Sequence, residues 1–564
     1  MQRRGRIALA ALTGLAVVAG PALPVSASPA VKGLPLGPAG LPETRTTQTL
    51  APGVVLTTIT RGKADPNQVY WTIGINIPLG EVLEDPDPDA DKGALGTAAK
   101  AQAVKAQLLA NPAVAAELAA RGWEPRIEAV DYAPTLTGYR GGLIGYTLRI
   151  GRFADRAATA SLISTLAAAG FSAFALNTGQ DGRPTSTGPW LLRVLTVDPD
   201  RFRGKVTSSV GDAISGQQTT SSIAAAAGAV YGVNGGYFTI NPNDGTPGVP
   251  AGLSVLHGTP VTAATNNRAV LVLRDNGRRA EIENLSSRYA LRFGTGRTHL
   301  VDALNRLPGK IRDCGGVGGD QPTERPVHDF TCTDPDEIVV FTDGYGVPTP
   351  TGPGVEALID RTGRVVTVRD RIGGTVPAGH RIVQAIGTDA AWLTANARVG
   401  ALLTLDTTVV DARGRTVCFG PRDFVVNGGP QLVSDGRVAV NPLADGLVHE
   451  DPSLGLPDSA LGASFGYNWF IRDNPRTGAG VDRQGRLILI QVDGRQAGIS
   501  QGLPIKEFAE VFKSLGAVEA INLDGGGSSA TVVNGTLISS PSDLNSAGQP
   551  TERATGDVIL VNAR

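Results

Sequence analysis

Short apolar runs, some rich in β-branched residues and one alternating with polar residues, are separated along this chain by frequent glycines and prolines, a pattern that predicts many short β-strands. The run Gly53–Thr60 is rich in β-branched residues, and Trp71–Ile77 alternates with period two, as a half-buried strand does. Further strands are predicted at Gly145–Phe153, Gly170–Leu176 and Trp190–Val197. Apolar residues at helical spacing predict helices over 93–122 and 157–169, and we expect two further helices over 220–229 and 504–515. This mixture predicts an α+β fold with mixed or antiparallel sheets and few helices.

The first residues of the chain predict export. Three arginines precede an apolar run from Ile7 to about Ala22, and Val25-Ser26-Ala27 has the small residues of a cleavage site. We therefore expect a signal peptide over 1–27 and a secreted or cell-wall-associated protein. A membrane anchor is the alternative, but the run is short and glycines interrupt it. No later run reaches the about 18 apolar residues of a membrane span, so we expect none in the mature chain.

Length and composition suggest several divisions. The chain has 564 residues, more than one ordinary domain holds. We expect a Pro/Gly-rich linker over 28–49, the first strands of the main domain over 50–80, a linker with Ala-rich helices over 81–139, a small strand–helix–strand–strand module over 140–198, and the rest of the main domain over 199–564. The charge is balanced, with 51 basic and 52 acidic residues, so we expect no nucleic-acid partner.

The three cysteines are Cys314, Cys332 and Cys418. Because export leads to an oxidising compartment, a disulfide between Cys314 and Cys332 is favoured over a zinc site, for which the spacing is poor. Cys418 would then be a free thiol, which we expect to be buried beside Phe419.

The strongest chemical signal is the segment Asn522-Leu523-Asp524-Gly525-Gly526-Gly527-Ser528-Ser529. It places an Asn and an Asp at the end of an apolar strand, followed by a glycine-rich backbone that can approach a ligand closely and direct N–H groups toward it. No Lys follows the glycines, so the segment is not a phosphate loop, and it is neither a dinucleotide fingerprint nor a nucleophile elbow. A tight turn is the alternative interpretation.

This segment resembles the hallmark of the phosphodiester glycosidases. Other segments agree with that family in the same order along the chain: Val233–Phe238, Val426–Leu432, Pro475–Gly480, Val492–Arg495 and the closing Thr551–Arg553 with its last strand. The resemblance covers about residues 200 to 564. One departure is Asn474, which stands where many bacterial relatives have a His before Pro-Arg-Thr.

The resemblance implies hydrolysis of a sugar-1-phosphodiester at the anomeric carbon. The departing phosphomonoester is a good leaving group, since its second pKa is about 6, so the site must chiefly bind phosphate and stabilise positive charge at C1. The implied catalytic residues are Asp524 facing C1, Arg476 on the phosphate and Glu552 as a second carboxylate. The implied substrate-binding residues are Asn234, Gly235, Gly236, Asn427, Gly428, Thr477, Asn522, Gly525, Gly526, Gly527, Ser528 and Ser529.

Each of these residues also has a structural interpretation. An Asp or Asn beside glycine often caps a turn, Arg476 could be a surface residue, and Glu552 could pair with Arg553 or Arg476. In the loop between the cysteines, His328, Asp329 and Asp320 could line the site or bind a cation, or simply belong to a surface loop. Asp334, Asp336 and Glu337 could bind calcium, although not with EF-hand spacing. The sequence indicates no certain cofactor and leaves a divalent cation open.

The module over 140–198 resembles the SPOR domain, a ferredoxin-like bacterial module that binds peptidoglycan glycan strands. The resemblance rests on Ile150-Gly151-Arg152-Phe153 and on the Ala157–Ala169 helix. An insertion with its own core should be removable without loss of turnover on small soluble substrates. Two rival functions remain: a non-catalytic envelope glycan-binding protein, and a phosphodiesterase that cuts the P–O bond.

Overall fold

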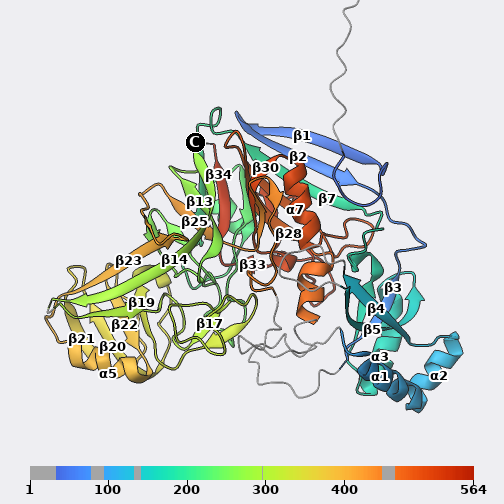
Figure 1. Ribbon diagram of the computed structural model, residues 1–564, viewed down its shortest axis with the longest axis horizontal. Coiled ribbons are helices and arrows are strands. Elements are labelled where there is room, and N and C mark those ends of the chain that lie inside the picture. Colours follow the sequence, from blue (N-terminus) through green and yellow to red (C-terminus); the bar gives the residue numbers. More distant parts are fainter. Residues whose placement is uncertain (1–32, 78–94, 133–141, 295, 448–463, 564) are drawn as a thin grey trace, which may run out of the picture. The chain divides into compact units, whose positions relative to one another are not determined.

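The computed structural model describes residues 33–77, 95–132, 142–294, 296–447 and 464–563. The predicted signal peptide over 1–27 therefore lies outside the described residues. The described residues from Pro35 onward form one compact unit. Strands dominate and helices are few, which agrees with the predicted α+β class (Figure 1). Within the described ranges, no helix is long and apolar enough to cross a membrane.

The largest part of the main domain is an eight-stranded antiparallel sheet. Its order is β1 (Glu43–Ala51), β2 (Val54–Arg61), β7 (Trp190–Val197), β29 (Leu487–Val492), β28 (Arg476–Asp482), β30 (Ala517–Asn522), β26 (Gln431–Ser434) and β27 (Arg437–Val438). Helix α7 (Ile505–Ser514) packs against β26 and β30 (Figure 1). Gly478 and Gly480 in β28 permit this packing, because a Cβ on either would press against Phe512 at about 2.9 Å.

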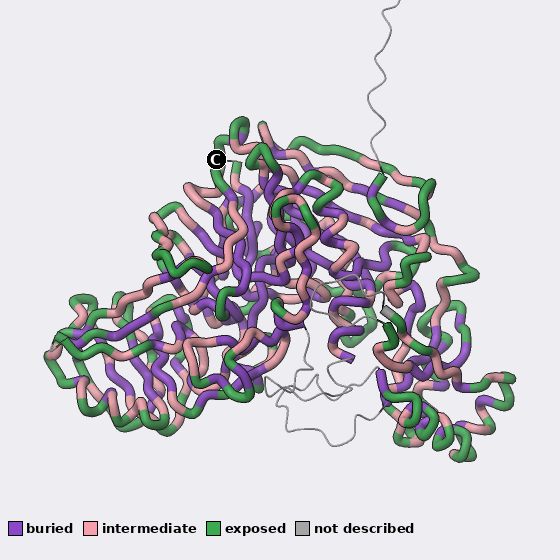
Figure 2. Tube along the Cα trace, viewed as in Figure 1, coloured by how far each residue is buried: buried purple, intermediate pink, exposed green. Residues whose placement is uncertain are grey.

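Two further sheets pack with this one. The five-stranded sheet runs β32 (Thr536–Leu537), β31 (Thr531–Val533), β10 (Tyr231–Asn234), β34 (Val558–Asn562) and β8 (Lys205–Ser209). The eight-stranded second sheet runs β12 (Thr259–Pro260), β11 (Val255–Leu256), β25 (Phe424–Asn427), β13 (Arg268–Arg274), β14 (Arg279–Phe293), β23 (Leu403–Asp411) and β24 (Thr416–Val417), with β15 (Thr298–Val301) paired to β14. Alternate apolar residues of all three sheets form one core, and buried residues gather along these strands in Figure 2.

A five-stranded sheet packs against the eight-stranded second sheet, and together they form a second apolar core. It runs β16 (Ala303–Leu304), β19 (Ile338–Thr342), β22 (Arg381–Ala385), β20 (Gly352–Ile359) and β21 (Val365–Ile372), and α5 (Gly387–Asn396) packs against β20 and β22. Two small pairs complete the main domain: β17 (Lys310–Arg312) with β18 (Thr331–Thr333), and β9 (Gln218–Thr219) with β33 (Ala554–Thr555). The helix α4 (Thr220–Ala226) follows β9, as predicted for residues 220–229.

The inserted module has its own four-stranded sheet and its own apolar core. The sheet runs β4 (Arg126–Tyr132), β5 (Gly142–Phe153), β3 (Trp71–Ile75) and β6 (Ala173–Asn177), covered by α1 (Ala98–Ala110), α2 (Pro112–Arg121) and α3 (Ala160–Ala168). The helical pattern over 93–122 is divided because Asn111 caps α2, accepting at its Oδ1 from the N–H of Ala113 at 3.1 Å. The SPOR resemblance stays a prediction.

Strand pairing changes the predicted domain assignment of two strands. Trp71–Ile75, assigned to the main domain, is a central strand of the module, whereas Trp190–Val197, assigned to the module, lies in the main sheet. The predicted linker over 28–49 contains most of β1, a polar, Thr-rich edge strand without the apolar alternation that would reveal it. These corrections share one cause, since a strand's partner is chosen by tertiary packing.

The cysteines behave partly as predicted. Cys314 and Cys332 form a disulfide across 18 residues, and both side chains are buried beside Ile311 and Val327. Cys418 is free, but it is exposed, which corrects the expectation that it is buried.

Candidate active site

Three strands from three different sheets end at one place, and each ends in an asparagine. Asn234 closes β10, Asn427 closes β25 and Asn522 closes β30. Strand β28 begins beside them, and the N–H of Leu523 donates to the carbonyl of Thr477 at 2.8 Å. The predicted motifs therefore meet in space, although almost 300 residues separate Asn234 from Asn522.

Asn234 ties these strand ends together. Its Nδ2 donates to the carbonyl of Asp524 at 2.8 Å, and its Oδ1 accepts from the hydroxyl of Thr477 at 2.7 Å. Both side chains are fully buried. The structure thus uses Asn234 and Thr477, predicted to bind substrate, to hold the scaffold.

Asn427 has a similar role. Its Oδ1 accepts from the N–H of Tyr237 at 2.9 Å, and its Nδ2 donates to the carbonyl of Tyr237 at 3.1 Å. The neighbouring glycines Gly235, Gly236 and Gly428 are needed for close packing, because a Cβ there would overlap Asp557, Asn427 or Asn522.

Asn522 differs, because part of its amide stays open. Its Nδ2 donates to the hydroxyl of Tyr237 at 2.7 Å and to the carbonyl of Gly429 at 3.2 Å. Its buried Oδ1 has no hydrogen-bond partner among the described residues. Such an oxygen is available to a donor on a ligand.

Two carboxyl groups flank Gly235. The N–H of Asp524 donates to the carbonyl of Gly235 at 3.1 Å, and the N–H of Gly235 donates to the carbonyl of Asp557 at 3.0 Å. Asp524 is half-buried, whereas Asp557 is only 1% exposed. The Oδ1 of Asp557 accepts from the N–H of Gly236 at 2.7 Å, and its Oδ2 has no partner within the described chain.

Burial raises the pKa of both carboxyl groups. The pKa of Asp524 rises to about 6, although hydrogen bonding by Ser528 and the charge of Arg553 oppose the shift. The pKa of Asp557 rises to about 7; the N–H of Gly236 lowers it, and the nearby charge of Asp524 raises it further. The two groups therefore influence each other and titrate near neutral pH.

Glu552, the predicted second carboxylate, lies elsewhere. It accepts from the N–H of Ser221 at 2.9 Å and from the hydroxyl of Ser221 at 2.6 Å, at the first turn of α4. This is the role of a carboxylate at a helix N-terminus. Asp557 was missed by the sequence reasoning; its one local signal is a polar residue after glycine, immediately before the apolar strand β34.

Arg476 is buried without a carboxylate partner. Its Nε donates to the carbonyl of Leu503 at 2.9 Å, its Nη2 donates to the carbonyl of Trp469, and its guanidinium lies 5.1 Å from the centre of the Trp469 ring. It forms no ion pair within the described ranges. Burial lowers its pKa to about 9, so a bound anion would stabilise the charged form. The alternative interpretation of Arg476 as a surface residue is excluded, since Arg476 is 2% exposed.

The glycine-rich turn differs from the predicted phosphate nest. The N–H groups of Gly525 and Gly526 donate to Asp524 Oδ1 at 2.8 Å and to the carbonyl of Pro475 at 3.0 Å. Those of Ser528 and Ser529 donate within the turn, η6 (Gly526–Ser528), at 3.1 and 3.3 Å. Gly527 is needed because a Cβ there would overlap the ion pair between Asp543 and Arg553.

An aromatic cluster borders this arrangement. His328 is 3% exposed, and its ring lies 4.4 Å from that of Tyr237 and 4.2 Å from that of Trp469, measured between ring centres. Its Nδ1 lies 2.5 Å from Arg268 Nη2, and the same guanidinium pairs with Asp313 at 2.5 Å. Of the two interpretations of the disulfide loop, His328 follows the one in which it lines the site.

The other acidic residues of that region have structural partners. Asp329 pairs with Arg312, and Asp320 accepts from the N–H of Gly316 at 2.8 Å. Glu337 pairs with Arg306, and Asp336 accepts from the N–H of Thr388. Asp334 accepts from the N–H of Asp336 at 2.9 Å. In the described part of the chain, no three metal-ligating side chains gather to hold an ion.

Asn474, the departure from the family pattern, joins two loops. Its Oδ1 accepts from Nε and Nη2 of Arg495 at 3.0 and 2.8 Å, and its Nδ2 donates to the carbonyl of Asn468 at 2.8 Å. An amide can donate and accept at once, which suits this position.

Comparison with known proteins adds independent information. The family model of the phosphodiester glycosidase domain matches residues 353–562. An N-acetylglucosamine-1-phosphodiester alpha-N-acetylglucosaminidase of Bos taurus is 32% identical over 176 residues, which cover 30% of each chain. The mouse protein of the same name is 52% identical over 68 residues, 12% of this chain and 13% of that one. The chain thus spans less than a third of the curated relatives it matches.

One solved structure resembles nearly the whole molecule. The crystal structure of a protein from Burkholderia pseudomallei K96243 has 31% sequence identity and a TM-score of 0.78. The alignment covers 94% of this chain and 98% of that one, so the inserted module belongs to the shared architecture.

Proposed function

Because this chain belongs to the phosphodiester glycosidase family, we propose that it hydrolyses the glycosidic bond of a sugar-1-phosphodiester, such as N-acetylglucosamine-1-phosphodiester. One observation carries the proposal. Asp524 and Asp557 flank Gly235 with raised pKa values, and Arg476 is buried without a carboxylate partner among the described residues. Tyr237 lies within electrostatic range of both Asp524 and Arg476, so these side chains share one neighbourhood.

The residues divide the chemistry between them. Arg476 holds the phosphate, whose departure with the C1–O bonding electrons needs little proton donation. Asp524, ionised above about pH 6, faces the positive charge that develops at C1. Water supplies the hydroxyl group to C1, and one carboxylate of the pair accepts its proton. A pair of carboxyl groups with different pKa values is suited to such exchange near neutral pH.

The proposed setting is outside the cytoplasm. The N-terminal arginines, apolar run and small-residue cleavage site support export. The module, if it binds glycan strands as the SPOR resemblance suggests, would hold the enzyme at the cell wall. Glycan phosphodiesters of the envelope are then the available substrates.

The test is turnover of N-acetylglucosamine-1-phosphodiesters by the purified protein. Free sugar plus phosphomonoester is the expected result. Release of sugar-1-phosphate would instead identify a phosphodiesterase that cuts the P–O bond. Absence of turnover across a panel of sugars and aglycones would support the non-catalytic glycan-binding protein.

A further inference from the structure

A short segment, Ser464–Arg472, lies between the inserted module and the candidate site; we call it the aromatic segment. It contains the helical turn η5 (Tyr467–Ile471). On the site side, the carbonyl of Trp469 accepts from Arg476 Nη2, and the Trp469 ring lies against His328. The aromatic segment therefore helps to position the guanidinium of Arg476, which also donates to the carbonyl of Leu503.

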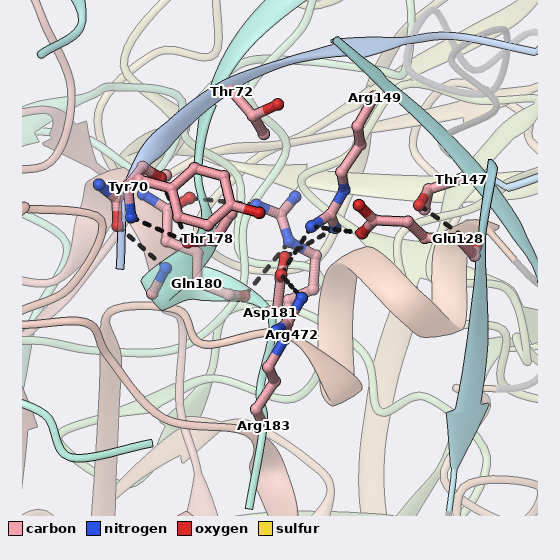
Figure 3. Close-up of polar contacts among 12 residues, drawn as sticks. Tyr70, Thr72, Glu128, Thr147, Arg149, Thr178, Gln180, Asp181, Arg183 and Arg472 are labelled. Carbon is pink, nitrogen blue, oxygen red and sulfur yellow. Dashed lines mark hydrogen bonds and ion pairs between the residues drawn. The ribbon is translucent and has the colours of Figure 1, made fainter. Parts of the chain in front are cut away.

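The module holds the aromatic segment through Arg149 of β5. This guanidinium is 3% exposed and pairs with both carboxylate oxygens of Asp181, at 2.7 and 2.8 Å. Its Nη2 also donates to the hydroxyl of Tyr467 at 3.1 Å. Figure 3 shows Arg149 directed toward Asp181, with Glu128 on its other side. Asp181 fixes the guanidinium, and the guanidinium fixes Tyr467.

Two further contacts secure the ends of the segment. At its start, the hydroxyl of Ser464 accepts from the N–H of Leu95 at 3.0 Å. At its end, Arg472 donates from Nη2 to Gln180 Oε1 at 3.1 Å, close to Asp181 in Figure 3. Gly182 permits this approach, because a Cβ there would overlap the carbonyl of Ile471.

These contacts are polar, whereas the apolar cores are separate. The module's core contains its own residues and none of the aromatic segment. A cavity of about 380 Å³ lies beside the contact, lined by Glu128, Arg149, Tyr467 and Glu507 among others. The module thus acts on the segment through a few directed hydrogen bonds, which single substitutions can remove without disturbing a core.

We infer that the inserted module is a positioning element of the active site, with Arg149 and Tyr467 as the residues that transmit its effect to Arg476. The inference rests on the proposed function, in which Arg476 binds the phosphate. It also changes the expectation for module deletion: turnover of small soluble substrates should fall, because the aromatic segment would lose its supports.

The decisive variant is Tyr467→Phe, which removes only the hydroxyl that accepts from Arg149. Its matched control is Tyr146→Phe. Tyr146 is a half-buried tyrosine on β5, the strand that carries Arg149, and its hydroxyl bonds no described residue. Titration calorimetry of the full-length protein with inorganic phosphate gives the Kd, and steady-state kinetics gives kcat and KM. We expect Tyr467→Phe to raise both Kd and KM by about 3- to 10-fold, with a smaller change in kcat.

Each outcome decides the inference separately from the proposed function. A Kd for phosphate within about twofold of wild type in Tyr467→Phe, or an equal effect of Tyr146→Phe, would overturn the positioning role. A wild-type protein that binds no phosphate would overturn it too. If phosphate binding weakens as expected but no sugar phosphodiester is hydrolysed, the positioning role stands and the proposed hydrolysis fails.

Discussion

Asp524 and Asp557 can be compared with a second group of partly or fully buried acidic side chains, Asp302, Asp320 and Glu337, which surrounds Arg306. Burial raises the pKa in both places: to about 7 for Asp557 and also to about 7 for Asp302. In the second group, however, the guanidinium of Arg306 supplies a positive charge, and Glu337 pairs with it through both carboxylate oxygens. At the site, neither carboxyl group forms an ion pair within the described ranges.

The comparison shows that a raised pKa alone does not identify an active site. Desolvation shifts any buried carboxyl group, including those that stabilise a fold. What distinguishes the site around Asp524 and Asp557 is the presence of buried polar atoms without hydrogen-bond partners. Asp557 Oδ2 and Asn522 Oδ1 have no partners in the described chain, and buried Arg476 has no carboxylate partner there. Groups without partners are available to a substrate.

The largest expected effect is on turnover in Asp524→Asn. The substitution keeps the shape and removes the charge, so kcat should fall by at least about 100-fold, the usual scale for losing an acid–base group. The fold should persist, because Asn can still accept from the N–H of Gly525. Circular dichroism verifies folding, and near-wild-type turnover in a folded variant would refute the assignment.

Asp557→Asn should lower turnover by about 10- to 100-fold and change the pH dependence of stability. Burial raises the folded-state pKa of Asp557 to about 7, above its ordinary value of 3.8, so the protonated carboxyl group contributes stability that is complete below pH 3.8 and is lost as pH rises through 7. Because the amide of Asp557→Asn does not titrate, the variant does not lose stability in this way as pH rises. Its free energy of unfolding, from urea titrations at pH 5 and pH 8, should therefore vary less than that of wild type.

The outcome against this prediction is specific. If Asp557→Asn leaves both turnover and the pH dependence unchanged, the carboxyl group is only a structural acceptor for the N–H of Gly236.

Glu337→Gln should affect stability and spare chemistry, the opposite of the site variants. It removes the buried carboxylate that pairs with Arg306 through both oxygens, which costs about 3 kcal/mol in the free energy of unfolding. Turnover per folded molecule should stay within about twofold of wild type. Denaturant titration measures the first quantity and active-fraction-corrected kinetics the second. A selective loss of turnover would show that the acidic group around Arg306 takes part in the chemistry, and it would contradict the distinction between this group and the site of Asp524 and Asp557.

The smallest effect is expected for Glu552→Gln. Its carboxylate bonds Ser221 at the start of α4, so the loss should be about 1 kcal/mol of stability, as for other helix-terminal groups. Turnover should change less than about threefold. A 100-fold loss of turnover would instead restore Glu552 as the second carboxylate of the site.

The sequence by itself determined the elements and motifs that depend on neighbouring residues. A β-branched run located β2, period-two alternation located β3, and helical spacing located α3; β7 and α7 were predicted as well. The segment Asn522–Ser529 and the disulfide between Cys314 and Cys332 were also predicted, because strand ends, glycine turns and cysteine spacing are local signals. Asp524 and Arg476 became candidates through the resemblance of their segments to the phosphodiester glycosidases.

Only the tertiary structure decided which groups face one another. It brought Asp557 to Asp524 and placed Glu552 at a helix start, although both lie near the end of the chain. It directed the N–H groups of Gly525 and Gly526 to protein oxygens instead of outward. It also brought His328 to Trp469, and Arg149 of the inserted module to Tyr467, 318 residues away. The physical reason is that partners in a sheet or a buried hydrogen bond are selected by packing of the whole chain, which no local pattern records.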